Sequence, residues 1–181
     1  MIYLNDDIAG FDLEAALPLL SEQRREQVLK FKHEQGRKTC ALAYLLLCEG
    51  LRKEYGITEK PIFEYGEHGK PFLVGHADIH FNISHCREAV LCVVSDRPVG
   101  ADIESIREYK DSLARYTMND DELARINGSP LEFIRLWTMK EAVLKLSGEG
   151  IRSDMKTVLT GHEHFHTVEN EKKGYVYSVI Y

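Results

Sequence analysis

Both halves of this chain combine helical patterns with strand patterns, and this combination sets the expected fold class. In the first half, apolar residues recur at helical spacing from Arg37 to Tyr55, and Gly56 follows as a stop. Residues 61–85 then alternate short apolar runs with Gly and Pro, as strands joined by turns do. Such grouping of helices and strands predicts an α+β fold, and their presence in both halves permits two lobes.

The other elements are expected from caps, breakers and alternation. Ser21 is the expected N-cap of a helix that continues past Val28. A Ser-Asp-Arg-Pro turn suits a hairpin between the strand-like runs on either side of it. The expected elements after residue 85 are strands at 89–94 and 99–103 joined as that hairpin, a helix at 111–126, a helix from Pro130 ended by Gly148 and Gly150, and a terminal hairpin in 158–181.

Charge and apolar content limit the classes of partner. A formal net charge of −6 argues against general nucleic-acid binding. Residues 24–38 are nevertheless locally basic, which suits a polyanionic small molecule. No run approaches the roughly 20 apolar residues of a membrane span, and the N-terminus lacks the pattern of a secretory signal. We therefore expect a cytoplasmic protein, a monomer, with no nucleic-acid or membrane partner.

Asp102 and Glu104 form the first candidate site. Both lie at the end of an expected strand, where alternate residues point to the same face, so their carboxylates converge. Mg²⁺ favours a few carboxylates, with water and substrate phosphates filling its other positions. A solvated strand edge is the alternative interpretation of such a pair.

Glu141 and Lys145 form the second candidate site. They are four residues apart on an expected helix and so share one face. Glu141 could bind a metal or accept a proton, and Lys145 could hold a phosphate oxygen. An ordinary surface ion pair explains the same spacing.

Two further groups of polar residues are weaker candidates. Ser84 and His85 are adjacent, so on an extended chain they point apart, and a hydrolytic triad is not expected. They could instead bind a phosphate or complete a turn. His162, His164 and His166 alternate and would share a strand face that could ligate Zn²⁺ or Ni²⁺, although a solvated strand face is the preferred interpretation.

Three motifs in order identify a family. They are F-N-I-S-H at 81–85, V-G-A-D-I-E at 99–104 and L-W-T-M-K-E-A-x-x-K-x-x-G-x-G at 136–150. Together with G-K-P at 69–71 and S-x-x-x-R-E-x-x-x-x-F at 21–31, they resemble the 4'-phosphopantetheinyl transferases of the surfactin-synthetase-activating type. The resemblance covers roughly residues 20–155.

The resemblance implies a fold and a site. It implies two pseudo-symmetric α+β lobes with coenzyme A in the cleft between them, 1–95 as the N-terminal lobe and 96–181 as the C-terminal lobe that carries the metal site. The implied ligands of Mg²⁺ are Asp102, Glu104 and Glu141, with Lys145 near the pyrophosphate. The implied nucleotide site consists of Arg24, Arg37, Lys38, Thr39, Lys70, Ser84 and His85, in which Ser84 and His85 face the 3'-phosphate. The match around residues 37–39 needs a one-residue gap, so Arg37 and Lys38 both remain candidates.

The implied reaction is Mg²⁺-dependent transfer of the phosphopantetheine group from coenzyme A to a serine of an apo acyl- or peptidyl-carrier protein, which releases 3',5'-ADP. Glu141 is the expected general base, directly or through a metal-bound water, and both routes remain open. Residues 106–126 mix basic and apolar side chains and are the candidate carrier surface, unless they are a helix packed on its own lobe. The competing functions are a Mg²⁺-dependent phosphohydrolase and a nucleotide- or carrier-binding module.

Overall fold

Helices and antiparallel sheets make up the computed structural model of the protein, which describes residues 1–148 and 154–181 and confirms the α+β class. The helices are α1 (Leu13–Ala16), α2 (Glu22–Lys30), α3 (Glu34–Tyr55), α4 (Asp111–Thr117), α5 (Asp120–Ile126) and α6 (Pro130–Ser147), with 3₁₀ helices η1 (Leu17–Leu19) and η2 (Met155–Thr157). The strands are β1 (Ile2–Asn5), β2 (Phe63–Tyr65), β3 (Pro71–Leu73), β4 (His80–His85), β5 (Val90–Ser95), β6 (Gly100–Ser105), β7 (His166–Asn170) and β8 (Tyr175–Ile180).

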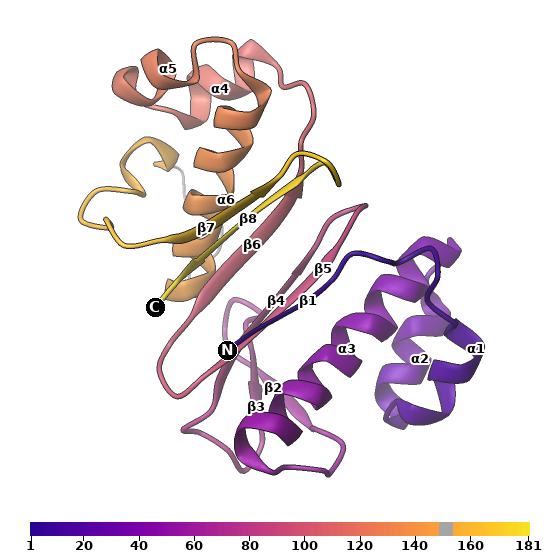
Figure 1. Ribbon diagram of the computed structural model, residues 1–181. Helices are drawn as coiled ribbons and strands as arrows, with labels where there is room; N and C mark the ends of the chain where they lie inside the picture. Colours follow the sequence, from indigo (N-terminus) through magenta and orange to yellow (C-terminus); the bar gives the residue numbers. More distant parts are fainter. Residues whose placement is uncertain (149–153) are drawn as a thin grey trace.

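The first sheet has the antiparallel order β1-β5-β4, and α3 covers one of its faces (Figure 1). Val90, Cys92 and Val94 alternate along β5 and pack in the same buried cluster as Leu47 and Leu51 of α3. This alternation follows from the two-residue period of a strand. A separate two-stranded sheet, β2-β3, lies against the end of this layer.

The second sheet has the antiparallel order β6-β8-β7, and α6 covers its outer face (Figure 1). Val176 and Ile180 of β8 pack toward the helical side, with Phe133 and Val143 of α6 in the same clusters. The terminal hairpin expected from the sequence is confirmed as β7 and β8.

The two sheets bury one apolar layer between them. Leu91 and Val93 of β5 pack with Ile103 of β6 and with Tyr177 and Val179 of β8. The layer therefore contains residues from both sides of residue 95. The division of the chain into lobes at 1–95 and 96–181 stays a prediction.

The hairpin expected between 89–94 and 99–103 is wrong. Strand β5 pairs with β1 on one edge and β4 on the other, so no edge is left for β6. Strand β6 pairs with β8 instead, and the chain crosses from the first sheet to the second between residues 95 and 100. The unexpected strand β1 is the physical reason, because it occupies the edge that a hairpin would need.

The single helix expected at 111–126 is also wrong. Met118 is extended, with ψ 144°, and separates α4 from α5. Asn119 then starts α5 with a capping box, in which its side chain accepts from Glu122 N and the Glu122 carboxylate accepts from Asn119 N. This cap satisfies amide groups that a continuous helix would bond to its own carbonyls.

Caps and stops elsewhere agree with the sequence. Ser21 caps α2 by accepting from Arg24 N, and Gly56 and Gly148 end α3 and α6 in the left-handed region. Helix α3 begins at Glu34, three residues before the expected start. Gly150 lies outside the described residues.

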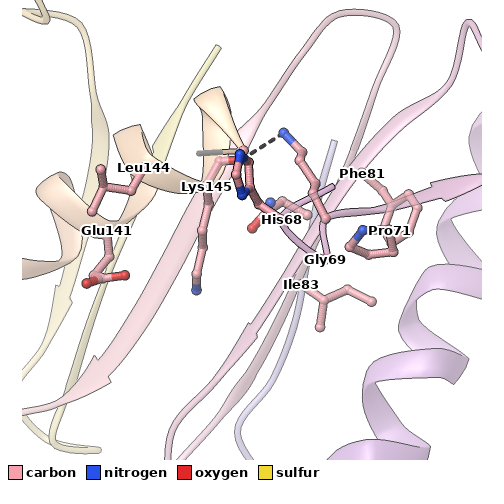
Figure 2. Close-up of a pocket in the computed structure, with 11 residues that line it drawn as sticks. His68, Gly69, Pro71, Phe81, Ile83, Glu141, Leu144 and Lys145 are labelled. Atoms are coloured by element: carbon pink, nitrogen blue, oxygen red, sulfur yellow. Dashed lines mark hydrogen bonds between the residues drawn. The ribbon is translucent and has the colours of Figure 1, made fainter. Parts of the chain in front are cut away.

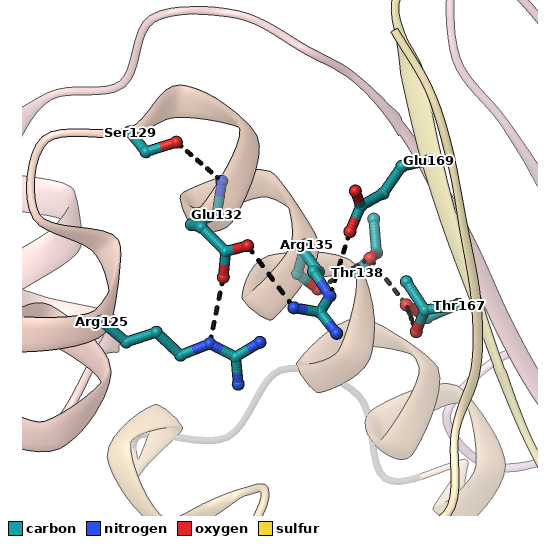
Figure 3. Close-up of polar contacts among 8 residues, drawn as sticks. Arg125, Ser129, Glu132, Arg135, Thr138, Thr167 and Glu169 are labelled. Carbon is teal, nitrogen blue, oxygen red and sulfur yellow. Dashed lines mark hydrogen bonds and ion pairs between the residues drawn. The ribbon is translucent and has the colours of Figure 1, made fainter.

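Polar side chains fix α6 onto the second sheet (Figure 3). Ser178 Oγ of β8 lies 2.9 Å from Thr138 Oγ1 of α6 and 3.0 Å from Thr167 Oγ1 of β7. Arg135 forms ion pairs with Glu132 on its own helix and with Glu169 of β7. The helix that carries Glu141 and Lys145 is thus held at a fixed position on the strands beneath it.

A buried ion pair also holds α6. Lys140 is 0% exposed, and its Nζ lies 2.8 Å from Glu122 Oε1 of α5 and 2.7 Å from Met155 O. One ammonium therefore joins α6, α5 and η2.

Among residues 1–148 and 154–181, none of the helices has the length and apolar character required to cross a membrane.

Candidate active site

Strand β6 approaches α6 closely at Gly100. A Cβ built on Gly100 would lie 1.9 Å from the carbonyl oxygen of Ala142, so no larger residue fits there without displacing the helix. Two residues further along the strand, Asp102 shares this face and is 4% exposed. The close approach brings the Asp102 carboxylate beneath α6.

Side chains of β4 join the edge of the first sheet to β6. Asn82 Oδ1 accepts from Ala101 N at 3.2 Å, and Ser84 Oγ accepts from Ile103 N at 3.4 Å. Both bonds are buried, so the two strands are fixed side by side although they belong to different sheets.

Ser84, Asp102 and Lys145 form one hydrogen-bonded group. Lys145 Nζ lies 2.6 Å from Asp102 Oδ1 and 2.9 Å from Ser84 Oγ, and Ser84 Oγ donates to the same Asp102 oxygen at 2.8 Å. These residues come from β4, β6 and α6, so the structure brings together three motifs that are far apart in the sequence. Ser84 therefore contacts a carboxylate and an ammonium.

Glu104 and Glu141 lie in the electrostatic field of Asp102. Burial, and then the negative charge of Asp102, raises the pKa of both carboxyl groups, and the Lys145 ammonium opposes this shift. Arg107 also lowers the pKa of Glu104, from a guanidinium 3.6 Å away. Such carboxylates hold protons more tightly than free ones and gain from a nearby cation.

The donor atoms suit a hard cation such as Mg²⁺. Asp102 Oδ2 is buried, and within the described part of the chain it has no hydrogen-bond partner. Carboxylate oxygens are the ligands that Mg²⁺ prefers. As they are placed, however, the described Asp, Glu, His and Cys side chains form no group of three or more that could hold a metal ion. Binding by all three carboxylates stays a prediction.

A cavity of about 270 Å³ opens beside this group (Figure 2). Glu141, Leu144 and Lys145 of α6 line one wall, and the turn before β3 and strand β4 line the other. The opposite wall consists of His68, Gly69, Lys70, Pro71, Phe81, Asn82 and Ile83. The cavity is thus largely apolar, with two lysines and one carboxylate at its surface.

Lys70 and His85 have different surroundings. Lys70 lines the cavity, and its Nζ donates to the carbonyl oxygens of Lys145 and Leu146 at 2.7 and 2.9 Å. Burial lowers the pKa of Lys70. His85, at the end of β4, retains solvent-exposed surface. Removal of part of its imidazole from water, and then the positive charge of Lys145, lower the pKa of the imidazole.

The other expected nucleotide ligands lie on α2 and α3. Arg24 stacks over Tyr44 and Phe63, 5.3 and 5.2 Å from the ring centroids. Arg37 and Lys38 donate to the carbonyl oxygens of Phe31 and Ala9, and Thr39 Oγ1 bonds to its own helix. None of the four lines the cavity beside Glu141 and Lys145. The Gln35 side chain, which donates to Arg87 O at 3.1 Å, brings the start of α3 near the end of β4.

Sequence analysis did not find the walls of the cavity or the role of Asn82. Asn82 lies inside the N-I-S-H motif, two residues before Ser84. Residues two apart on a strand share a face, so the sequence could have placed Asn82 beside Ser84. Phe81 and Leu144 look like ordinary core positions, and no local pattern marks them.

The three alternating histidines do not share a strand face. Strand β7 begins only at His166, and His162 and His164 precede it in irregular structure. Their expected common face is therefore wrong.

Comparison with known proteins gives matches to one family. The model of the 4'-phosphopantetheinyl transferase superfamily matches residues 98–179. This range contains Asp102, Glu104, Glu141 and Lys145.

Two individual relatives match over most of the chain, and a third matches over about half of it. 4'-Phosphopantetheinyl transferase psf-1 of Bacillus pumilus is 32% identical over 154 residues, which are 82% of this chain and 66% of that protein. 4'-Phosphopantetheinyl transferase Sfp of Bacillus subtilis strain 168 is 29% identical over 156 residues, 83% of this chain and 70% of the relative. 4'-Phosphopantetheinyl transferase HetI of Nostoc sp. strain PCC 7120 is 37% identical over 100 residues, 49% of this chain and 42% of the relative.

Proposed function

This chain belongs to the 4'-phosphopantetheinyl transferase superfamily, and we therefore propose that it transfers the 4'-phosphopantetheine group of coenzyme A to a serine of an apo acyl- or peptidyl-carrier protein. One observation supports this proposal most directly. Ser84, Asp102 and Lys145 come from three separate motifs and meet in a single hydrogen-bonded group, of which Lys145 lines a cavity.

Lys145 would stabilise the leaving group. The serine oxygen attacks the phosphorus that bears pantetheine, the bond from that phosphorus to the bridging oxygen breaks, and 3',5'-ADP leaves with added negative charge. A fixed ammonium beside that charge lowers the barrier, because it needs no reorganisation during the reaction. The hydrogen bonds from Lys145 to Ser84 and Asp102 keep its ammonium at one place.

Glu141 is the proposed general base for the serine proton. A carboxylate can accept this proton, and in the metal-free protein burial and the charge of Asp102 raise the pKa of Glu141. Its position on α6, one turn before Lys145, puts the base and the cation on the same wall of the cavity.

Asp102, Glu104 and Glu141 are the residues that would hold Mg²⁺. When bound, Mg²⁺ would neutralise charge on the pyrophosphate oxygens. Two features favour a cation there: the buried Asp102 Oδ2 has no hydrogen-bond partner among the described residues, and the neighbouring carboxyl groups have raised pKa values.

The nucleotide portion of coenzyme A would occupy the cavity between α6 and the turn at Gly69 to Pro71. Its apolar walls suit a planar base. His85 and the basic residues at the start of α3 would lie toward the 3'-phosphate, which the contact between Gln35 and Arg87 supports. The carrier class, whether for fatty-acid, polyketide or peptide synthesis, would be read from a panel of carriers.

Mass spectrometry of an apo-carrier protein tests the function. Incubation with the chain, coenzyme A and Mg²⁺ should add the mass of one phosphopantetheine group to the carrier, and chelation of Mg²⁺ should prevent it. Asp102→Asn should abolish the gain, while Asp78→Asn, at an exposed position between β3 and β4, should not. Consumption of coenzyme A without any gain would support a phosphohydrolase and refute the transfer.

A further inference from the structure

The end of α6 carries backbone carbonyls that the helix itself cannot satisfy. Gly148 ends α6 in the left-handed region, and its N–H donates to Leu144 O at 3.0 Å. The carbonyls of Lys145 and Leu146 come next, and within the described part of the helix no backbone amide four residues further on is available to them. Lys70 Nζ, from 75 residues earlier in the chain, donates to the next two carbonyl oxygens, those of Lys145 and Leu146.

Lys145 is consequently held at both ends. Its carbonyl oxygen accepts from Lys70 at 2.7 Å, and its own ammonium lies 2.6 Å from Asp102 and 2.9 Å from Ser84. The positive charge of Lys70 also opposes the partial negative charge of the helix C-terminus. Losing the Lys70 bonds would allow the last turn to fray, and Lys145 lies in that turn.

The turn that carries Lys70 is itself well fixed. Gly66 N donates to Lys70 O at 3.0 Å, and Gly69 N donates to Gly66 O at 2.9 Å. Gly69 has a φ of 80°, a conformation that glycine adopts without strain. Lys70 therefore projects from a defined turn and not from a long loop.

We infer that Lys70 is a positioning residue that caps α6 and thereby fixes Lys145, and that it is not a direct ligand of the nucleotide. Two of the three donors of its ammonium are directed at helix carbonyls. The inference deepens the proposed function, because fixing Lys145 matters to the reaction only if Lys145 acts on the pyrophosphate.

Lys60 provides a matched control. Its Nζ donates to Leu20 O at 2.7 Å and Pro18 O at 3.4 Å, so it caps the end of η1 in the same way, away from the cavity. Lys70→Met should lower kcat about tenfold and change the KM for coenzyme A by less than about twofold, since a lost position affects the transition state more than substrate binding. Lys60→Met should change neither. Lys70→Arg, which keeps the charge and the donors, should retain most of the wild-type kcat.

Hydrogen exchange provides a readout that does not need activity. In Lys70→Met, the amides of the last turn of α6, residues 144–148, should exchange about tenfold faster than in the wild type, and in Lys60→Met they should not. In a Lys145→Met background, Lys70→Met should lower kcat by less than about twofold, because there is no ammonium left to position.

Two results would overturn the inference. One is a large rise in the KM for coenzyme A in Lys70→Met with unchanged exchange in α6, which would make Lys70 a nucleotide ligand. The other is a loss of kcat on Lys70→Met that is equally large in the wild-type and Lys145→Met backgrounds. A wild-type protein that transfers nothing would instead refute the proposed function, and the exchange measurement would still decide whether Lys70 caps α6.

Discussion

The ammonium of Lys145 is held by two side chains at the wall of the cavity, so removing it tests the proposed chemistry with little change in volume. We expect Lys145→Met to lower the rate of transfer about 100-fold or more, in the range found for a lost donor to a developing negative charge. Lys156→Met, at an exposed position of η2, is the control. A transfer rate within about threefold of the wild type would rule out this role for Lys145.

The ionised side chain of Glu141 should destabilise the folded protein. Burial, the Asp102 charge and the Glu104 charge raise its pKa, so the ionised form is less favourable in the folded than in the unfolded state. A raised folded pKa gives stability that is complete below the unfolded pKa and is lost as pH rises through the folded pKa. Glu141→Gln should therefore have a higher Tm than the wild type at neutral pH in a chelator, and the difference should vanish below the ordinary glutamate pKa of 4.5.

The control for this stability measurement is Glu163→Gln, at an exposed position outside the cavity. It should leave the Tm unchanged at both pH values. If Glu141→Gln lowered the Tm at neutral pH, the Glu141 carboxylate would stabilise the fold, and the electrostatic account of the site would be wrong.

Helix α6 depends on the buried pair of Lys140 and Glu122. Lys140→Met leaves the Glu122 carboxylate buried without its cation, which should lower the free energy of unfolding by about 3–5 kcal/mol in urea denaturation. Adding Glu122→Gln should restore part of the loss, because the uncompensated charge is gone. Lys53→Met, which removes a half-exposed pair with Glu49, should cost less than about 1 kcal/mol. Equal losses in the two lysine variants would contradict the difference in burial.

Local signals predicted the elements well where a cap or a stop determines them. Ser21, Gly56 and Gly148 each mark a boundary that the structure confirms, because capping depends on a few neighbouring residues. The pairing of β5 was predicted wrongly because it depends on β1, which is more than 80 residues away. The break at Met118 was missed because helical periodicity continues through it, although Asn119 and Glu122 form a recognisable capping box.

For the site, spacing alone predicted which residues share a face, and the structure supplied what joins them. Glu141 and Lys145 lie together on α6, and Lys145 meets Asp102 and Ser84 through tertiary packing that no local pattern contains. The bond from Lys70 to the end of α6 was equally inaccessible, because it joins residues 75 positions apart.

The net charge of the protein affects how a carrier protein could dock. A net charge of −6 would repel an acidic partner. Helix α4 offers a local exception. It packs inward through Ala114 and Thr117, while Leu113 and Tyr116 are 39% and 65% exposed beside the exposed Arg115. A surface with apolar side chains and positive charge suits an acidic carrier.

Reversing charge on α4 tests this docking surface. Lys110→Glu with Arg115→Glu should raise the KM for the carrier about tenfold and leave the KM for coenzyme A unchanged, and salt should inhibit the wild type more than the variant. The control is Arg52→Glu with Lys53→Glu, near the end of α3. An unchanged carrier KM in the α4 variant would remove this helix from the interface.

The apolar layer between the two sheets makes the halves of the chain mutually dependent. A fragment that ended at residue 95 would expose Leu91 and Val93 to water, and the complementary fragment would expose Ile103, Tyr177 and Val179. Ser84 belongs to the first sheet and Asp102 to the second. Their hydrogen bond therefore forms only when the two fragments associate. Two such fragments produced separately would each be prone to aggregation, and recovery of catalysis on mixing them would report reassembly of the complete fold.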